Sequence, residues 1–265
     1  MSTAGLQYGF HHKRSFTSTA KAALRYQSYS GTLKVLLHCY NPINFLKRYV
    51  TGQGAYPAII DLRTPIGPVG VTAFSPEDIL TINEIFFWKD YGQSRTDRIV
   101  VDFGSNVGIS SLYFLTRNPY STLYCHEPLP QNIARLRQNL RGFEDRYHLS
   151  ETAVAEHDGT AQFGWEPTGR YGGIGYASAR QMTVPAVDSN RILTEIVERH
   201  GEIDLLKIDI EGSEHEITAR IPFDLARRIR RLAIELPFRD NPLPRTHDMH
   251  YRWPITTLIR RAERF

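Results

Sequence analysis

Cysteine is scarce in this 265-residue chain, which carries only Cys39 and Cys125. Two cysteines cannot build a disulfide framework or a CxxC metal site, so a reducing compartment is expected. Long apolar runs are missing as well, because no stretch approaches the roughly 20 residues of a membrane-spanning helix. No positively charged start leads into an apolar segment of the secretory kind. With 41% apolar and 23% charged residues, the composition predicts a soluble, cytoplasmic globular protein.

Acidic residues are also missing from the start of the chain, where the first one is Asp61. The cations that precede it are Lys13, Arg14, Lys21, Arg25, Lys34, Lys47 and Arg48. This pattern is typical of a solvated arm, of a mitochondrial transit peptide, or of a segment attracted to an anionic surface. Nucleic acid is not expected as a partner, because no stripe of interleaved aromatic and basic residues occurs. Peripheral contact of this basic arm with an anionic surface is therefore a hypothesis.

The first third of the chain divides into two segments. Residues 1–52 are predicted to form a basic helical extension, with helices at Thr17–Tyr29, at Thr32–Tyr40 and after Pro42. Residues 53–97 are predicted to hold two short strands around the turn TPIGP, followed by a helix that begins after Ser75.

From residue 98 to residue 265, apolar strands alternate with amphipathic helices. Strands are predicted at 98–103, 121–126, 147–154, 203–209 and 230–236. Helices are predicted at 108–117, 129–141, 189–200 and 213–219, with a last one at Pro254–Arg264. The alternation favours an α/β domain with a doubly wound, mainly parallel sheet and helices on both faces.

The segment IVVDFGSNVGIS, residues 99–110, indicates where a ligand binds. The first strand ends at Asp102, and a loop containing Gly104, Ser105, Asn106 and Gly108 leads into a helix. In doubly wound sheets the carboxyl end of this strand is the usual ligand crevice, and glycine lets the backbone approach the ligand closely. The spacing D-x-G-x-N-x-G differs from GxGxxG, so a dinucleotide pyrophosphate is not predicted.

Three further residues point to the kind of ligand. Glu127 ends the second strand, where an acid is placed to accept hydrogen bonds from both ribose hydroxyls. The small Ala153 in the third strand is placed to face an adenine. A nucleoside without a pyrophosphate indicates S-adenosylmethionine as the cofactor. Glu84, in the helix before the loop, is then placed to reach the methionine amino group.

Six segments follow one another in the order and spacing of a known family: VVDFGSNVG, EP, TAVAEHDG, VPAVDSNRIL, IDLLKIDIEGSEHE and LAIELP. Between Ile82 and Pro237 the chain resembles the FkbM-type methyltransferases. The resemblance implies a Rossmann-like class I fold and methyl transfer from S-adenosylmethionine, usually to a hydroxyl of a sugar or secondary metabolite. It assigns the cofactor loop to Asp102–Gly108, the ribose-binding acid to Glu127, and the family signature to Lys207–Glu214. This fold usually closes with a two-stranded hairpin, which the predicted C-terminal helix leaves out.

The signature KIDIEGSEHE places four acids after a buried strand. Because alternate residues share a face, Asp209 and Glu211 are expected beside the predicted sulfonium. Asp209 is the first candidate for a base or for a residue that orients the acceptor, and His215 is an alternative base. Glu216 is expected to complete an S-x-x-E capping box with Ser213.

One more acid comes to this site from the next strand, since Glu235 ends LAIEL at the same sheet edge. An alternative role for these carboxylates is a Mg²⁺ site, because hard cations prefer oxygen ligands. Its candidate ligands are Asp209, Glu211, Glu214 and Glu235.

The loop 164–180, with Arg170, Tyr171 and Tyr176, is expected to cover the acceptor. The function that these features favour is O-methylation of a small molecule or glycan. Two alternatives stay open: an N- or C-methyltransferase on the same fold, and a non-catalytic nucleoside-binding scaffold. The sequence leaves the acceptor and the oligomeric state undetermined.

Overall fold

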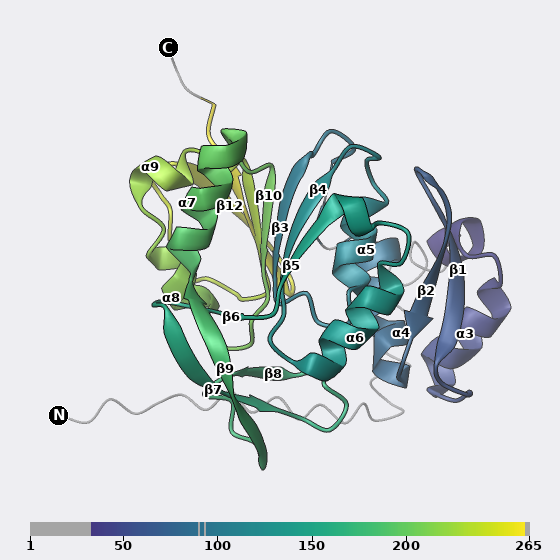
Figure 1. The fold of residues 1–265 in the computed structure, drawn as a ribbon. Coiled ribbons are helices and arrows are strands. Elements are labelled where there is room, and N and C mark those ends of the chain that lie inside the picture. Colours follow the sequence, from purple (N-terminus) through teal and green to yellow (C-terminus); the bar gives the residue numbers. More distant parts are fainter. Residues whose placement is uncertain (1–32, 90, 93, 263–265) are drawn as a thin grey trace.

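A seven-stranded sheet forms the centre of the protein in a computed structural model that describes residues 33–262 except 90 and 93 (Figure 1). Its strands lie in the order β12-β13-β11-β10-β3-β4-β5. They are β3 (Ile99–Phe103), β4 (Thr122–His126), β5 (Tyr147–Ser150), β10 (Leu205–Ile208), β11 (Arg231–Ile234), β12 (His247–Arg252) and β13 (Ile255–Arg260). Five strands are parallel, whereas β13 is antiparallel to β11 and β12. The predicted doubly wound, Rossmann-like fold is confirmed.

Helices cover both faces of this sheet (Figure 1). They are α5 (Ile109–Leu115) and α6 (Pro130–Asn139) on one face, and α7 (Ser189–His200), α8 (Glu214–Ala219) and α9 (Phe223–Ala226) on the other. Neighbouring strand residues divide between two hydrophobic clusters: Val100 and Leu205 pack on the α5 side, Val101 and Leu206 on the α7 side. Burial on both faces explains why these strands are continuous apolar runs.

The closing hairpin, which the sequence analysis leaves out, is present. β12 and β13 pair antiparallel over their whole lengths, so the predicted helix at Pro254–Arg264 is wrong. Thr256 and Leu258 of β13 are fully buried, and so is His247 of β12, whose Nε2 lies 3.0 Å from the carbonyl oxygen of Ile229. The pattern was misleading for two reasons: HDMHYR contains no apolar run, and proline suits the first turn of a helix.

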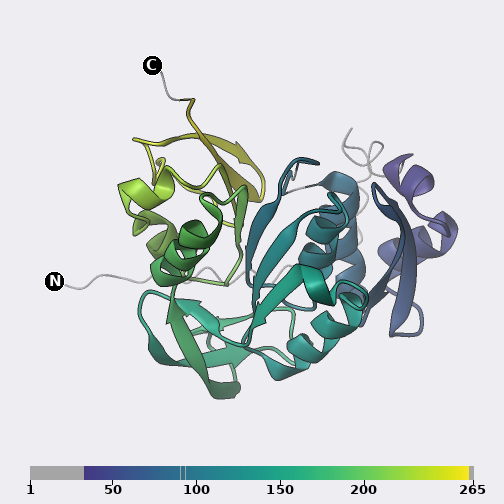
Figure 2. The ribbon, with the colours of Figure 1, turned by 45° about the horizontal axis from the view of Figure 1, so that its top comes forward.

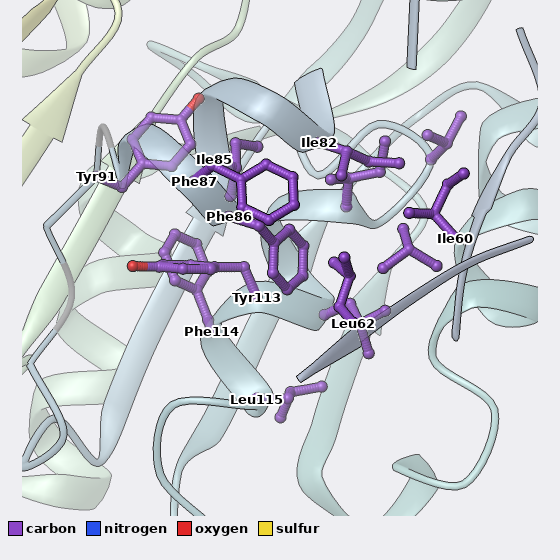
Figure 3. Packing of buried hydrophobic residues seen from close by; sticks show 14 of the residues in the cluster. Ile60, Leu62, Ile82, Ile85, Phe86, Phe87, Tyr91, Tyr113, Phe114 and Leu115 are labelled. Atoms are coloured by element: carbon purple, nitrogen blue, oxygen red, sulfur yellow. The ribbon is translucent and has the colours of Figure 1, made fainter. Parts of the chain in front are cut away.

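The segments before the central sheet pack into the same core as α5. They are helical residues 33–38, α3 (Pro42–Thr51), β1 (Ala58–Thr64), β2 (Gly67–Ala73), α4 (Pro76–Ile82) and the π-helix η1 (Asn83–Trp88). Phe45 of α3 meets Phe87 edge to face, with ring centroids 5.2 Å apart. Phe86 meets Tyr113 of α5 in the same way at 5.3 Å (Figure 3). Residues from all three predicted segments, 1–52, 53–97 and 98–265, thus belong to one hydrophobic cluster. The predicted helix Thr17–Tyr29 lies outside the described residues.

A second sheet, in the order β6-β9-β7-β8, lies across one end of the central strands (Figures 1 and 2). Its strands are β6 (Ala153–Ala155), β7 (Gly159–Trp165), β8 (Gly172–Ile174) and β9 (Arg180–Asp188). The single strand predicted at 147–154 is therefore divided, since residues 153–155 pair with β9 instead of continuing beside β4. The predicted loop 164–180 contains β8. No helix among the described residues has the length and apolar character needed to cross a membrane.

Candidate active site

The loop between β3 and α5 approaches the backbone that follows β10. Gly104 has a φ of 78°, and a β-carbon at this position would overlap the carbonyl oxygen of Asp209. Glycine alone combines this left-handed backbone with so close an approach. The backbone N–H groups of Gly104 and Ser105 donate to the carbonyl oxygen of His126 at 3.1 and 3.0 Å. The loop is thereby held between the carboxyl ends of β10 and β4.

A first hollow of about 610 Å³ lies between this loop, the end of β4 and the second sheet. Glu127 lines it, and its carboxylate accepts hydrogen bonds from the backbone N–H groups of Asn106 and Leu129, both at 2.9 Å. Burial raises the pKa of Glu127 to about 7. The apolar part of the wall consists of Ala153, Val154, Phe163, Ile174 and Ile210. The hollow therefore combines a buried carboxyl group with an apolar surface.

A second hollow of about 760 Å³ adjoins the first. The two share the residues Gly104, Asn106, Arg170, Asp209 and Glu211. Carboxyl groups dominate the second hollow, from Asp78, Glu84, Asp209, Glu211 and Glu235. Lys207, Arg170, Tyr91 and Tyr171 line it as well. The structure therefore brings together the three carboxylates that the sequence predicts as catalytic, Asp209, Glu211 and Glu235.

Lys207 is the buried positive charge beside these acids. Its side chain is 2% exposed, and its Nζ lies 2.9 Å from Asp102 Oδ1 and 3.3 Å from Asp209 Oδ2. The same Nζ donates to the carbonyl oxygen of Gly104 at 2.8 Å. Burial lowers the pKa of Lys207, but the negative charges of Asp102 and Asp209 outweigh burial and leave the pKa raised. Lys207 therefore stays charged and links the glycine loop to Asp209.

Asp102 and Gly108, both predicted to contact the cofactor, line neither hollow. Asp102 is fully buried and accepts hydrogen bonds from the hydroxyls of Ser110 and Ser111, both at 2.8 Å. Gly108, with a φ of 82°, packs against Leu136 of α6. Both residues face the interior, where these contacts fix the conformation of the loop. Of the other predicted cofactor residues, Gly104, Asn106, Glu127 and Ala153 line the first hollow, and Glu84 and Ser105 line the second.

Tyr91 joins two of the acids. Its hydroxyl lies 3.2 Å from Glu235 Oε2 and 3.5 Å from Asp209 Oδ2. The negative charge of Asp209 raises the pKa of Glu235 well above its usual value, even though Glu235 is exposed to solvent. Burial, followed by the charges of Glu235 and Asp209, raises the pKa of Tyr91. Glu235 and Tyr91 therefore favour their protonated forms, in which both can donate hydrogen bonds.

Glu214 shapes the loop that carries Glu211. Its buried carboxylate accepts hydrogen bonds from the backbone N–H groups of Ile210 at 3.0 Å and Gly212 at 2.9 Å. Glu211 between them has a φ of 58° and lines both hollows. Burial, with the charges of Asp209 and Glu214, raises the pKa of Glu211 to about 8. Glu214 thus positions Glu211.

The capping box predicted at the start of α8 is wrong. Ser213 is the N-cap residue, but its side chain makes no capping hydrogen bond and Glu216 is exposed, so the capping box is not formed. Glu214 instead binds the preceding backbone. His215 lines neither hollow, and its exposed ring stacks on Phe238 with centroids 5.5 Å apart. It lies on the outer side of a helix whose inner side carries Glu214, which keeps it away from the acids.

Two of the four carboxylates considered as Mg²⁺ ligands, Asp209 and Glu214, have other partners here. In the described part of the chain, no three His, Cys, Asp or Glu residues are arranged to hold a metal ion. The carboxylate of Glu214 is engaged by two backbone N–H groups. The ammonium group of Lys207 supplies the positive charge beside Asp209.

Tyr91 is the site residue that the sequence analysis missed, because no motif surrounds it. The role of Lys207 was also missed, although the sequence contains a signal for it. A lysine within the apolar strand LLKI is costly to bury unless carboxylates pair with it, so its partners could have been sought among the acids of neighbouring strands. In the predicted cover, Arg170 lines both hollows and Tyr171 the second, whereas Tyr176 lines neither.

Comparison with known proteins places the chain in a family. Residues 102–236, just over half of the chain, match the Methyltransferase FkbM domain. The chain is 36% identical over 69 residues to the 2-O-methyltransferase NoeI of Sinorhizobium fredii, covering 26% of this chain and 28% of NoeI. It is 26% identical over 216 residues to the 31-O-demethyl-FK506 methyltransferase FkbM of Streptomyces tacrolimicus, covering 69% of this chain and 83% of that protein.

A solved structure, Methyltransferase FkbM from Methylobacillus flagellatus, shares 12% identity with a TM-score of 0.42, over 89% of this chain and 62% of that chain. The chain therefore spans less than two thirds of NoeI and of this solved structure. On the match over residues 102–236, the chain belongs to the FkbM methyltransferase family.

Proposed function

We propose that this protein transfers a methyl group from S-adenosylmethionine to a hydroxyl oxygen of a small acceptor, namely a sugar, a glycan or a secondary metabolite. The observation that carries the proposal is the pair of adjoining hollows, one suited to a nucleoside and one rich in carboxyl groups, with Asp209 and Glu211 in both. Methyl transfer needs cofactor and acceptor held in contact in this way. The names of NoeI and of the Streptomyces relative refer to oxygen positions, which supports oxygen as the acceptor atom.

The first hollow fits the nucleoside of S-adenosylmethionine. A carboxylate has about four acceptor positions, and Glu127 spends two on backbone N–H groups, so positions are left for ribose hydroxyls. Asn132 lines the same hollow, and its buried Oδ1 has no hydrogen-bond partner among the described residues. A buried acceptor without a partner favours a ligand that donates to it. When bound, the cofactor supplies an electrophilic methyl group carried on a sulfonium.

Asp209 is the proposed proton acceptor. A neutral hydroxyl is a weak nucleophile at neutral pH, so a positioned base assists the displacement. The ammonium of Lys207 lies 3.3 Å from Asp209 Oδ2 and holds the carboxylate in place. Glu235 and Tyr91 can donate hydrogen bonds that orient the acceptor oxygen. As that oxygen takes up the methyl group, its proton passes to the carboxylate of Asp209.

Two measurements test the proposal. Calorimetry with S-adenosylhomocysteine reports on the first hollow, and product analysis with a methyl-labelled cofactor across a panel of hydroxyl and amine acceptors reports on the second. We expect binding and a methyl ether product. A product methylated on nitrogen or carbon would replace the oxygen assignment, and binding without turnover on any acceptor would favour the nucleoside-binding scaffold. Folded protein that binds no S-adenosylhomocysteine would remove the proposal altogether.

Cofactor affinity is expected to fall as the pH is lowered through about 7, the raised pKa of Glu127 in the free protein. Hydroxyl groups bind a carboxylate more strongly than a neutral acid, so cofactor binding lowers this pKa and is strongest when Glu127 is ionised. The affinity is full above that pH and declines by up to about tenfold per pH unit below it. Calorimetry on both sides of neutral pH measures the effect. Glu127→Gln should bind more weakly with little pH dependence, whereas a pH-independent wild type would contradict the prediction.

A further inference from the structure

Two consecutive helices, residues 33–38 and α3, lie at the end of the molecule beyond β1 and β2 (Figures 1 and 2). Both present apolar side chains to solvent. These side chains are 50% to 80% exposed and belong to Leu33, Leu36, Leu37, Ile43 and Val50. The inner sides of the same helices are also apolar, since Val35 and Phe45 are buried. An ordinary surface helix has its apolar stripe on the core side only. An additional outward apolar surface indicates a binding face.

Cations gather around the same face. They are Lys34, Arg63, Lys89 and Arg95. Arg63 donates to the carbonyl oxygen of Leu37 at 3.2 Å, and its guanidinium lies 4.1 Å from the centroid of the Tyr40 ring. Burial lowers the pKa of His38, and the positive charges of Lys89, Arg117, Arg63 and Lys34 lower it further, which agrees with cations around this helix. Arg117 itself is partly buried, because its guanidinium lies over the rings of Tyr113 and Phe86. Arg95 is near Lys89, because burial and cations including Arg95 lower the pKa of Lys89. Among the described residues, none of the four forms an ion pair with a carboxylate.

We infer that these five aliphatic side chains and four cations, here called the basic apolar face, bind a membrane surface that carries anionic lipid headgroups. A soluble anion would engage the cations but leave the aliphatic side chains in water. A neutral apolar partner would engage the aliphatic side chains but leave the cations unpaired. An anionic lipid surface engages both, since apolar groups enter the headgroup boundary while cations contact the phosphates. The absence of any acid before Asp61 extends this charge along the chain.

The basic apolar face lies close along the chain to the second hollow. Lys89 directly follows η1, and Tyr91, two residues later, lines that hollow. Docking on a membrane would therefore hold the second hollow near the lipid surface. The inference stands whether or not the protein transfers methyl groups, because it rests on surface residues outside both hollows.

Flotation of the full chain with vesicles tests the inference. Wild type is expected to float with vesicles of phosphatidylcholine mixed with phosphatidylglycerol, to stay behind with phosphatidylcholine alone, and to bind less as salt is added. Leu37→Asp and Ile43→Asp should each weaken binding about tenfold. Lys89→Glu should weaken it about fivefold or more. Ile259→Asp and Arg228→Glu make the same changes at exposed positions elsewhere and should leave binding unchanged. Thermal unfolding confirms that each variant is folded.

Three outcomes would overturn the inference. One is equal binding to the two kinds of vesicle. Another is binding that survives the face variants but disappears when Lys13, Arg14, Lys21 and Arg25 are replaced by Gln, which would assign it to the basic arm alone. The last is a wild type that binds no vesicles and is dimeric by light scattering, with Leu37→Asp monomeric. The face would then be a contact between two copies.

Discussion

Asp209→Asn is expected to lower kcat by about a hundred- to ten-thousand-fold, the usual contribution of a general base. The amide keeps the size of the side chain but cannot take up the proton of an acceptor hydroxyl. Asp209 Oδ2 lies 3.3 Å from Lys207 Nζ and 3.5 Å from the Tyr91 hydroxyl, so the substitution changes the charge with little change in packing. Single-turnover methylation with labelled cofactor measures the chemical step apart from product release.

Two further variants sharpen that measurement. Asp240→Asn makes the same change at an exposed acid and should leave kcat unchanged. Glu235→Gln should lower kcat less than Asp209→Asn does, because Glu235 favours its protonated form and glutamine still donates a hydrogen bond. Binding of S-adenosylhomocysteine should persist in all three variants. A large loss in Glu235→Gln with normal turnover in Asp209→Asn would show that Glu235 is the base.

The first hollow was predictable from local sequence. β3, β4 and β10 are buried on both faces, so they read as continuous apolar runs, and the residues at their carboxyl ends meet at one edge of the sheet. The left-handed backbone at Gly104 depends on residues that are neighbours in the sequence, and Glu127 directly follows β4. For these reasons a single strand–loop–helix pattern was enough to place the first hollow.

The parts of the fold and of the site that the sequence analysis missed depend on contacts between segments far apart in the sequence. β6 leaves the run of β5 to pair with β9, and no local pattern marks where that exchange occurs. β12 is held by its pairing with β13 and by the buried His247, although its own residues are mostly polar. Asp102 looked like a ligand contact, yet it faces the interior because Lys207 and two serine hydroxyls surround it. Tyr91 comes to Glu235 only through the packing of η1 against α5.

Lys207→Met is expected to lower the free energy of unfolding by about 3–5 kcal/mol, the usual cost of breaking a buried ion pair on one side. Methionine fills most of the same volume with a flexible chain, so the loss is one of charge more than of packing. Asp102, fully buried, would keep only the hydroxyls of Ser110 and Ser111 as partners for its negative charge. Urea unfolding followed by circular dichroism measures the change. Lys47→Met, at an exposed lysine, should shift it by at most about 0.5 kcal/mol.

The double variant Lys207→Met with Asp102→Asn separates charge from packing. If the cost of Lys207→Met comes from the uncompensated carboxylate, removing that charge should restore part of the stability, so the double variant is more stable than the sum of the two single losses predicts. Asparagine can still accept a hydrogen bond from Ser110 or Ser111, which limits its own cost. Additive losses would show that Lys207 stabilises the protein through packing and through its bond to the Gly104 carbonyl, and not by neutralising Asp102.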